Sequence, residues 1–101
     1  MDTLENLLGL LAKTLRDTLS RKETVREFQR CFWGNQLRFK SSIGHDAYNI
    51  LADLAYDLEF FEADPGVRAQ ESTYYGHERL EREIETALRQ LAQLGISVLG
   101  P

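Results

Sequence analysis

The densest concentration of chemically active side chains lies between residues 46 and 64, where neither Lys nor Arg occurs. The segment holds six carboxylates: Asp46, Asp53, Asp57, Glu59, Glu62 and Asp64. A surface of this charge attracts basic partners and repels nucleic acid. The first chemistry that the sequence suggests is therefore electrostatic recognition of a cationic macromolecule, and we expect no nucleic-acid partner.

Catalytic and metal-binding chemistry is poorly provided for. The two histidines, His45 and His77, lie far apart, and neither a Glu-x-x-His nor a His-Glu-x-x-His pair occurs. Serine-nucleophile motifs and Gly-rich phosphate loops are also missing from the sequence. Paired carboxylates act as general acid and base only in a concave site with shifted pKa values. We therefore expect no enzyme activity, no cofactor and no metal site.

Cys31 is the single cysteine, which excludes an intramolecular disulfide and a cysteine-rich zinc site. No histidine lies near it in the sequence to activate the thiol. We expect Cys31 to be a small, buried, apolar side chain beside Phe32.

These side chains must be positioned by helices. Leucines and other apolar residues recur at helical spacing in four stretches, at about 3–19, 21–33, 45–61 and 77–94. The alternating β-branched runs typical of a sheet are absent, apart from the tail 96–99. The first two helices have a very short connection, which favours an antiparallel hairpin. We therefore predict an all-α fold, an antiparallel four-helix bundle, formed by a single domain over residues 1–101.

Helix ends and loops carry their own signals. Asp2 with Glu5, and Ser20 with Glu23, resemble capping boxes at the starts of the first two helices. Glycine or asparagine should cap the later ends, at Gly34–Asn35 and Gly95, and the Pro65–Gly66 turn should end the third helix. Segments 35–44 and 67–76 are expected to be loops, the first with at most one helical turn. The apolar tail 96–99 could pack on the bundle, pair with another chain or fray.

Charge is distributed unevenly along the chain. Residues 1–40 hold eight basic and five acidic side chains, a net charge of +3, whereas residues 41–101 hold four and eleven, a net charge of −7. The leucine-rich start is preceded by acids rather than bases, which is the wrong order for a signal peptide, and it is too short to span a membrane. We expect a cytoplasmic protein without a membrane partner.

The helix expected at 45–61 has an unusual outer surface. At roughly 100° per residue, Asp46, Asp53 and Asp57 fall on one edge, with Tyr56 and Phe60 beside them. Carboxylates four residues apart repel each other, and no base lies on this helix to compensate. Such a local cost often marks a functional surface.

A structural alternative remains open for these residues. The acids could pair with Arg26, Arg30 or Arg79 across the bundle, while a neighbouring helix buries the rings. Tyr74 and Tyr75 raise the same question, because tyrosine is common at the centres of interfaces but one of the two could equally pack beneath the loop.

Three segments resemble a known family: the run 47–58 (AYNILADLAYDL), the run 60–65 (FFEADP) and the run 72–76 (STYYG). They are similar to bacterial toxin-immunity proteins, namely the small helical ones of the colicin D immunity type and of contact-dependent growth inhibition systems. The resemblance covers roughly residues 20–92.

The resemblance implies a cognate inhibitor that covers the basic active-site region of a toxin domain, often a nuclease. It implies electrostatic partner-binding roles for Asp53, Asp57, Glu59, Glu62 and Asp64, and anchoring roles for Tyr56, Tyr74 and Tyr75. The basic first half departs from a uniformly acidic inhibitor, and leaves open a different kind of toxin or a homodimer. The competing hypothesis is a helical structural or regulatory module that self-associates through the apolar stripe of the first helix and the tail 96–99.

Overall fold

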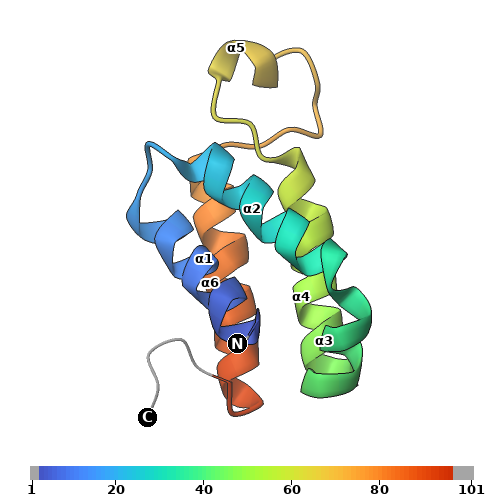
Figure 1. The fold of residues 1–101 in the computed structure, drawn as a ribbon. Helices are drawn as coiled ribbons and strands as arrows, with labels where there is room; N and C mark the ends of the chain where they lie inside the picture. The colour runs from blue at the N-terminus through green and yellow to red at the C-terminus, as the bar shows by residue number, and fades with distance from the viewer. Residues whose placement is uncertain (1–2, 97–101) are drawn as a thin grey trace.

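The structure, a computed structural model, describes residues 3–96, and every regular element in this range is helical (Figure 1). Four long helices are joined by two short helices and one 3-10 turn. In chain order these are α1 (Thr3–Arg16), α2 (Arg21–Gly34), α3 (Gln36–Ile43), α4 (His45–Asp57), η1 (Leu58–Phe60), α5 (Pro65–Arg68) and α6 (His77–Gln93). The predicted all-α class is confirmed.

The long helices pack around one apolar core. α1 lies against α2 and α6, and α4 lies against the same two helices. Each long helix contributes buried apolar side chains, among them Leu7, Leu11, Phe28, Phe32, Leu51, Leu54, Leu80, Ile84 and Leu91. Each buried Leu or Phe stabilises the fold by roughly 1.5–3 kcal/mol. The apolar stripe of α1 is therefore used inside the chain.

The first helix ends three residues earlier than predicted. The Asp17 carboxylate accepts hydrogen bonds from the backbone N–H of Leu19 (3.2 Å) and Ser20 (3.4 Å), a local turn that competes with the helix. Leu19 is consequently 98% exposed. The predicted capping box at Ser20 is wrong, because its φ and ψ (−105°, 17°) are not those of an N-cap and its hydroxyl makes no hydrogen bond with the described residues.

The segment predicted as a loop at 35–44 is helix α3. Phe39 is buried and stacks on Phe32 with ring centroids 5.7 Å apart, so tertiary packing overrides the weak helix propensity of Ser41 and Ser42. The helix ends at Ile43 and is followed by Gly44, whose φ of +90° favours glycine.

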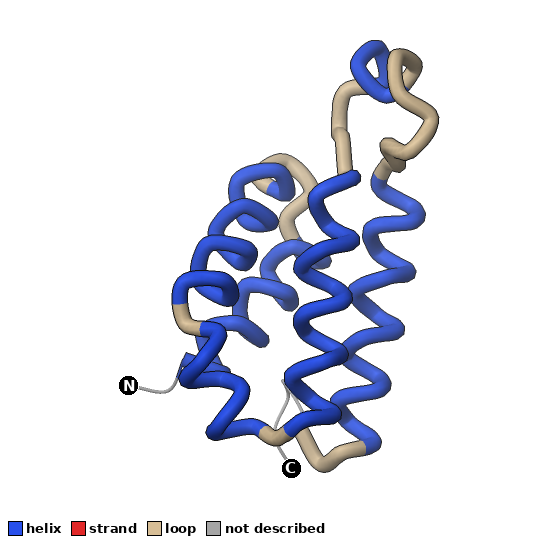
Figure 2. The backbone as a smooth tube through the Cα atoms, turned by 90° about the vertical axis from the view of Figure 1, so that its right-hand side faces the viewer, coloured by secondary structure: helices blue, strands red, loops and turns tan. Residues whose placement is uncertain are grey.

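Residues 61–76, here called the 61–76 loop, project beyond the ends of the long helices (Figures 1 and 2). The loop is closed at its base by an isolated parallel bridge between Phe61 and Tyr75. Where a Pro65–Gly66 turn followed by a loop from residue 67 was predicted, the structure has the four-residue helix α5. Asp64 caps α5 by accepting a hydrogen bond from the Gly66 N–H (2.8 Å), with Pro65 in the first turn.

The third predicted helix also ends early, since α4 stops at Asp57 and continues as η1 to Phe60. At the end of α6 the expected cap is confirmed: Gly95 has φ +87° and its N–H bonds the Ala92 carbonyl. Ile96 packs half-buried on the core. The predictions for Asp2 and for residues 97–99 lie outside the described residues.

Candidate functional site

The predicted partner-binding residues divide between the two sides of α4. Asp53 and Asp57 face α6, in a groove of about 250 Å³ that Glu83 and Gln90 also line. Glu59, Glu62 and Tyr74 lie on the side that faces α2, in a second groove of about 150 Å³. The sequence placed all of these side chains in one patch, whereas the structure gives two.

Asp57 and Tyr75 form an internal cluster. Tyr75 is only 7% exposed, and its single hydroxyl proton is shared between the backbone carbonyl of Asp57 (2.9 Å) and Oδ2 of the same residue (2.8 Å). Arg79 lies over the Tyr75 ring, 4.7 Å from its centroid, and pairs with Asp57 Oδ1 at 3.5 Å. This side of the molecule therefore follows the structural alternative, in which an arginine of the chain neutralises the acid.

Burial of the Tyr75 phenol raises its pKa well above the usual value, and the hydrogen bond to Asp57 adds to the effect. Tyr75 thus stays neutral and fixes the end of α4 against the start of α6. As an anchor for a partner it is poorly placed, because its ring and hydroxyl are already occupied.

Asp53 and Tyr56 differ from this cluster. The Asp53 side chain is exposed and has no hydrogen bond or ion pair within residues 3–96. Tyr56 is 61% exposed and meets the half-buried Phe60 edge to face, with centroids 5.7 Å apart. An unpaired carboxylate at the α6 edge of α4 is therefore followed, three positions later, by a large exposed amphipathic ring.

Asp64 is mainly structural. Its carboxylate caps α5, and its own N–H donates to Glu62 Oε2 at 3.1 Å. Arg68 supports the same loop by donating to the Glu62 carbonyl at 2.8 Å. Tyr74, by contrast with Tyr75, is 38% exposed. Of the adjacent tyrosines, one packs and one reaches the surface.

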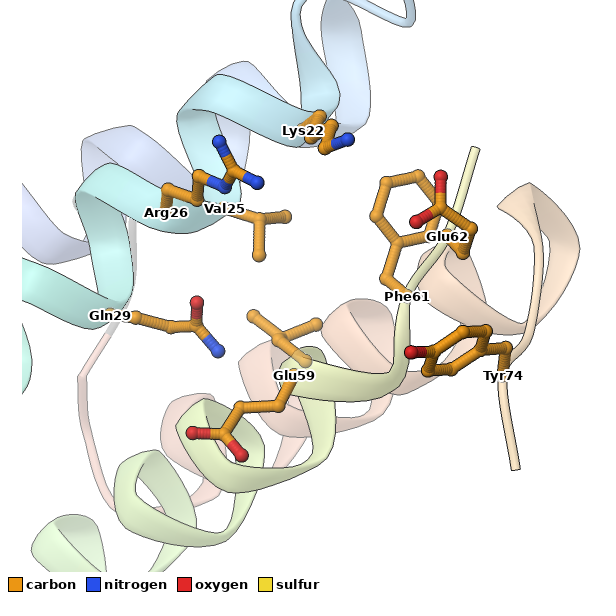
Figure 3. A pocket seen from close by; sticks show the side chains of 9 residues that line it. Lys22, Val25, Arg26, Gln29, Glu59, Phe61, Glu62 and Tyr74 are labelled. Atoms are coloured by element: carbon orange, nitrogen blue, oxygen red, sulfur yellow. The ribbon is translucent and has the colours of Figure 1, made fainter. Parts of the chain in front are cut away.

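The groove that faces α2, here called the α2–η1 groove, has two charged walls (Figure 3). Lys22 and Arg26 come from α2, and Glu59 and Glu62 come from η1 and the start of the 61–76 loop. Its remaining lining is Val25, Gln29, Leu58, Phe61 and Tyr74. No ion pair joins the two walls within the described part of the chain.

Sequence reasoning missed Arg21, which is 1% exposed. Its guanidinium donates to the carbonyls of Thr14 (2.7 Å) and Leu15 (3.0 Å), and pairs with Glu81 at 2.8 Å. It also lies 2.9 Å from His77 Nδ1, which must accept because Arg has only donors. A signal was present: Arg21, Val25, Phe28 and Phe32 follow one helical stripe, and this stripe is the buried face of α2.

Other chemistry is sparse in this part of the chain. Among residues 3–96, no three His, Cys, Asp or Glu side chains are grouped so that they could hold a metal ion, and none of the helices there is long and apolar enough to cross a membrane. Cys31 is half-buried, and burial raises the pKa of its thiol, with the nearby Glu27 charge as a smaller cause. The raised pKa opposes thiolate formation and fits a packing role.

Comparison with known proteins gives no relative, since no family model, no curated protein and no solved structure matches the chain. The functional argument therefore rests on the side chains themselves. Their arrangement offers charge and aromatic surface for non-covalent binding.

Proposed function

We propose that this chain is an immunity protein, which binds and neutralises a cognate bacterial toxin domain by covering the toxin's basic active-site region. A nuclease is the toxin class that the acidic surface suits best, because the active-site cleft of a nuclease is basic in order to bind phosphates. The observation that carries the proposal is that α4 exposes both Asp53, a carboxylate without a partner among the described residues, and the ring of Tyr56.

The physical argument has two parts. Exposed carboxylates steer a positively charged partner and accelerate association, with an effect that salt screens. An exposed tyrosine supplies large contact area at a small cost in side-chain entropy, and tyrosine is enriched among the residues that dominate binding energy. Asp53 thus provides attraction and Tyr56 provides the anchor.

In this proposal α1, α2, α4 and α6 act as a rigid antiparallel four-helix bundle that presents the α4 face. Glu59, Glu62 and Tyr74 extend the contact surface beyond η1. Asp57, Asp64 and Tyr75 hold that surface in shape through the internal hydrogen bonds described above. A cytoplasmic location is part of the proposal, since an immunity protein must meet the toxin there.

The test is co-expression with the protein encoded by the adjacent reading frame, which this proposal expects to contain a toxin domain. The wild-type chain should protect the cell and bind the domain. The double variant Asp53→Lys with Tyr56→Ala should weaken binding about 100-fold, about 2.7 kcal/mol, since it reverses one charge and removes a hot-spot ring. Asp57 is left intact because its substitution would disturb Tyr75.

The control variant is Glu78→Lys with Gln93→Ala on α6, where both side chains are exposed. Like the test variant it raises the net charge by two and truncates one neutral side chain, but away from α4, and it should keep protection. Unchanged killing by the toxin in the presence of the wild-type chain would refute the proposal. Wild-type affinity of the Asp53 and Tyr56 variant would remove the α4 face from the interface.

A further inference from the structure

We propose that the α2–η1 groove receives a toxin segment that carries one acidic and one basic side chain beside an apolar one. This inference rests on the proposed function and names the chemistry of the contact. It makes the partner surface dipolar, and it gives the basic first half of the chain a role in recognition.

The first step is the separation of charge across the groove. Lys22 and Arg26 reach in from α2 on one side, while Glu62 and Tyr74 lie on the other (Figure 3). Charges that are not paired within the chain remain available to a partner of complementary charge. Here neither base forms an ion pair within residues 3–96, and neither do Glu59 and Glu62.

The second step is the apolar lining between the charges. Val25, Leu58 and Phe61 are buried and belong to the core, so they form a firm floor. Gln29 donates its amide N–H to the Ala55 carbonyl (3.0 Å), which holds the side chain in place and leaves its oxygen as an acceptor. A floor of this kind can seat an aliphatic side chain while the walls meet its charged neighbours.

The third step is the size of the groove and its place in the molecule. A volume of about 150 Å³ admits one apolar side chain and no folded element, so the charged neighbours of that side chain would lie at the walls. Glu59 follows shortly after Tyr56 in the sequence, and the exposed ring of Tyr74 is also part of the lining. The groove opens on the α2 side of α4, whereas Asp53 lies on the α6 side, so a toxin docked on α4 would have to place a protruding segment around η1 to reach it.

The occupant follows from charge complementarity. Its carboxylate would face Lys22 and Arg26, and its guanidinium or ammonium group would face Glu59 and Glu62. An inhibitor that used only negative charge would gain nothing from the two bases, which would repel a basic cleft. The two models therefore predict opposite signs for one substitution.

The decisive experiment is the double variant Lys22→Glu with Arg26→Glu, titrated against the toxin domain that the co-expression test identifies. The dipolar model predicts that affinity falls at least about tenfold. A purely acidic inhibitor would bind a basic cleft more tightly after this change. The matched control is Arg82→Glu with Arg89→Glu, two exposed bases on α6 without ion pairs among the described residues, which changes net charge equally.

Binding that is tightened, or changed no more than in the control, would overturn the inference and leave the proposed function standing. A wild-type chain that does not bind the domain would instead refute the proposed function. Thermal unfolding of both variants shows whether each is folded when it is titrated.

A second measurement decides on the groove without the toxin. The ¹⁵N-labelled chain is titrated with the tripeptide acetyl-Asp-Leu-Arg-amide at millimolar concentration. The amide signals of Val25, Gln29 and Phe61 should shift, and the neutral tripeptide acetyl-Asn-Leu-Gln-amide should shift them much less. Equal shifts with both peptides, or no shifts at these residues, would show that the groove does not select its ligand by charge.

Discussion

Arg21 and Lys22 are neighbours in the sequence, but they lie in opposite environments. Arg21 is buried, and its guanidinium reaches two backbone carbonyls, His77 and Glu81. Lys22 is exposed on the wall of the α2–η1 groove, where it and Arg26 have no ion pair within the described residues. One step of about 100° around the helix separates a charge that supports the fold from one that is free to meet a partner.

The comparison shows where charge is costly in this molecule. A buried guanidinium is tolerated only when its donors are satisfied, and the Arg21 cluster ties the end of α1 to the start of α6. An exposed base is well solvated and needs no partner. Charge reversal should therefore affect stability at the first site and recognition at the second.

The largest effect is expected for Arg21→Leu. The substitution leaves the Thr14 and Leu15 carbonyls and His77 Nδ1 without their donor, so we expect the free energy of unfolding to fall by about 3 kcal/mol. Urea denaturation followed by circular dichroism measures this loss. Arg21→Lys should not restore the stability, because an ammonium group cannot reproduce the fork of donors.

The control is Lys22→Leu, at the next position of the same helix. It should change stability by less than about 0.5 kcal/mol. Equal losses in the free energy of unfolding for Arg21→Leu and Lys22→Leu would contradict the conclusion that only the buried base supports the fold.

A smaller effect is expected for Tyr75→Phe. The ring remains, but the phenolic proton shared by the two Asp57 oxygens is lost, so the free energy of unfolding should fall by about 1–2 kcal/mol. Tyr74→Phe, at the adjacent exposed position, should cost less than about 0.5 kcal/mol. Similar losses for the two variants would contradict the structural role assigned to Tyr75.

The free energy of unfolding at alkaline pH provides a second test of the role of Tyr75. The pKa of Tyr75 is raised in the folded chain, so the unfolded chain releases the phenolic proton first, near pH 10. The contribution of Tyr75 is therefore complete below about pH 10 and is lost as the pH rises above it. Tyr75→Phe should remove this part of the alkaline destabilisation, whereas Tyr74→Phe should retain it.

Helical periodicity was enough to predict the class of the fold and the four long helices, because each has a clear apolar stripe. It failed at 35–44, where the burial of Phe39 against Phe32 decides the outcome and lies beyond the reach of local propensity. It also failed to see Arg21, although the residue falls on the buried stripe of α2, since an arginine is rarely expected inside a core.

The site was predictable only in part. The outward placement of Asp53 and Tyr56 followed from the period of α4, and the structure agrees. Which of Tyr74 and Tyr75 packs depends on the bridge from Phe61 to Tyr75, which joins segments 14 residues apart (61 to 75). Likewise, the sequence predicts the same exposed environment for Asp57 and Asp53. Only the fold places Tyr75 and Arg79, which are distant in sequence, beside Asp57.

The smallest effect, and the one that sharpens the comparison most, is expected for Lys22→Gln with Arg26→Gln in the free protein. If the walls of the α2–η1 groove stay unpaired in solution, removal of both charges should change the free energy of unfolding by less than about 0.5 kcal/mol. The measurement is urea denaturation at low and at high salt.

A loss above about 1 kcal/mol that high salt abolishes would instead show that Lys22 and Arg26 pair with Glu59 and Glu62, as screened surface ion pairs do. The groove would then be closed by its own charges, and Glu62→Gln alone should give a loss of the same kind. A salt-independent result near zero keeps both walls available, and any loss of toxin affinity in the charge-reversed variant must then arise at the contact itself.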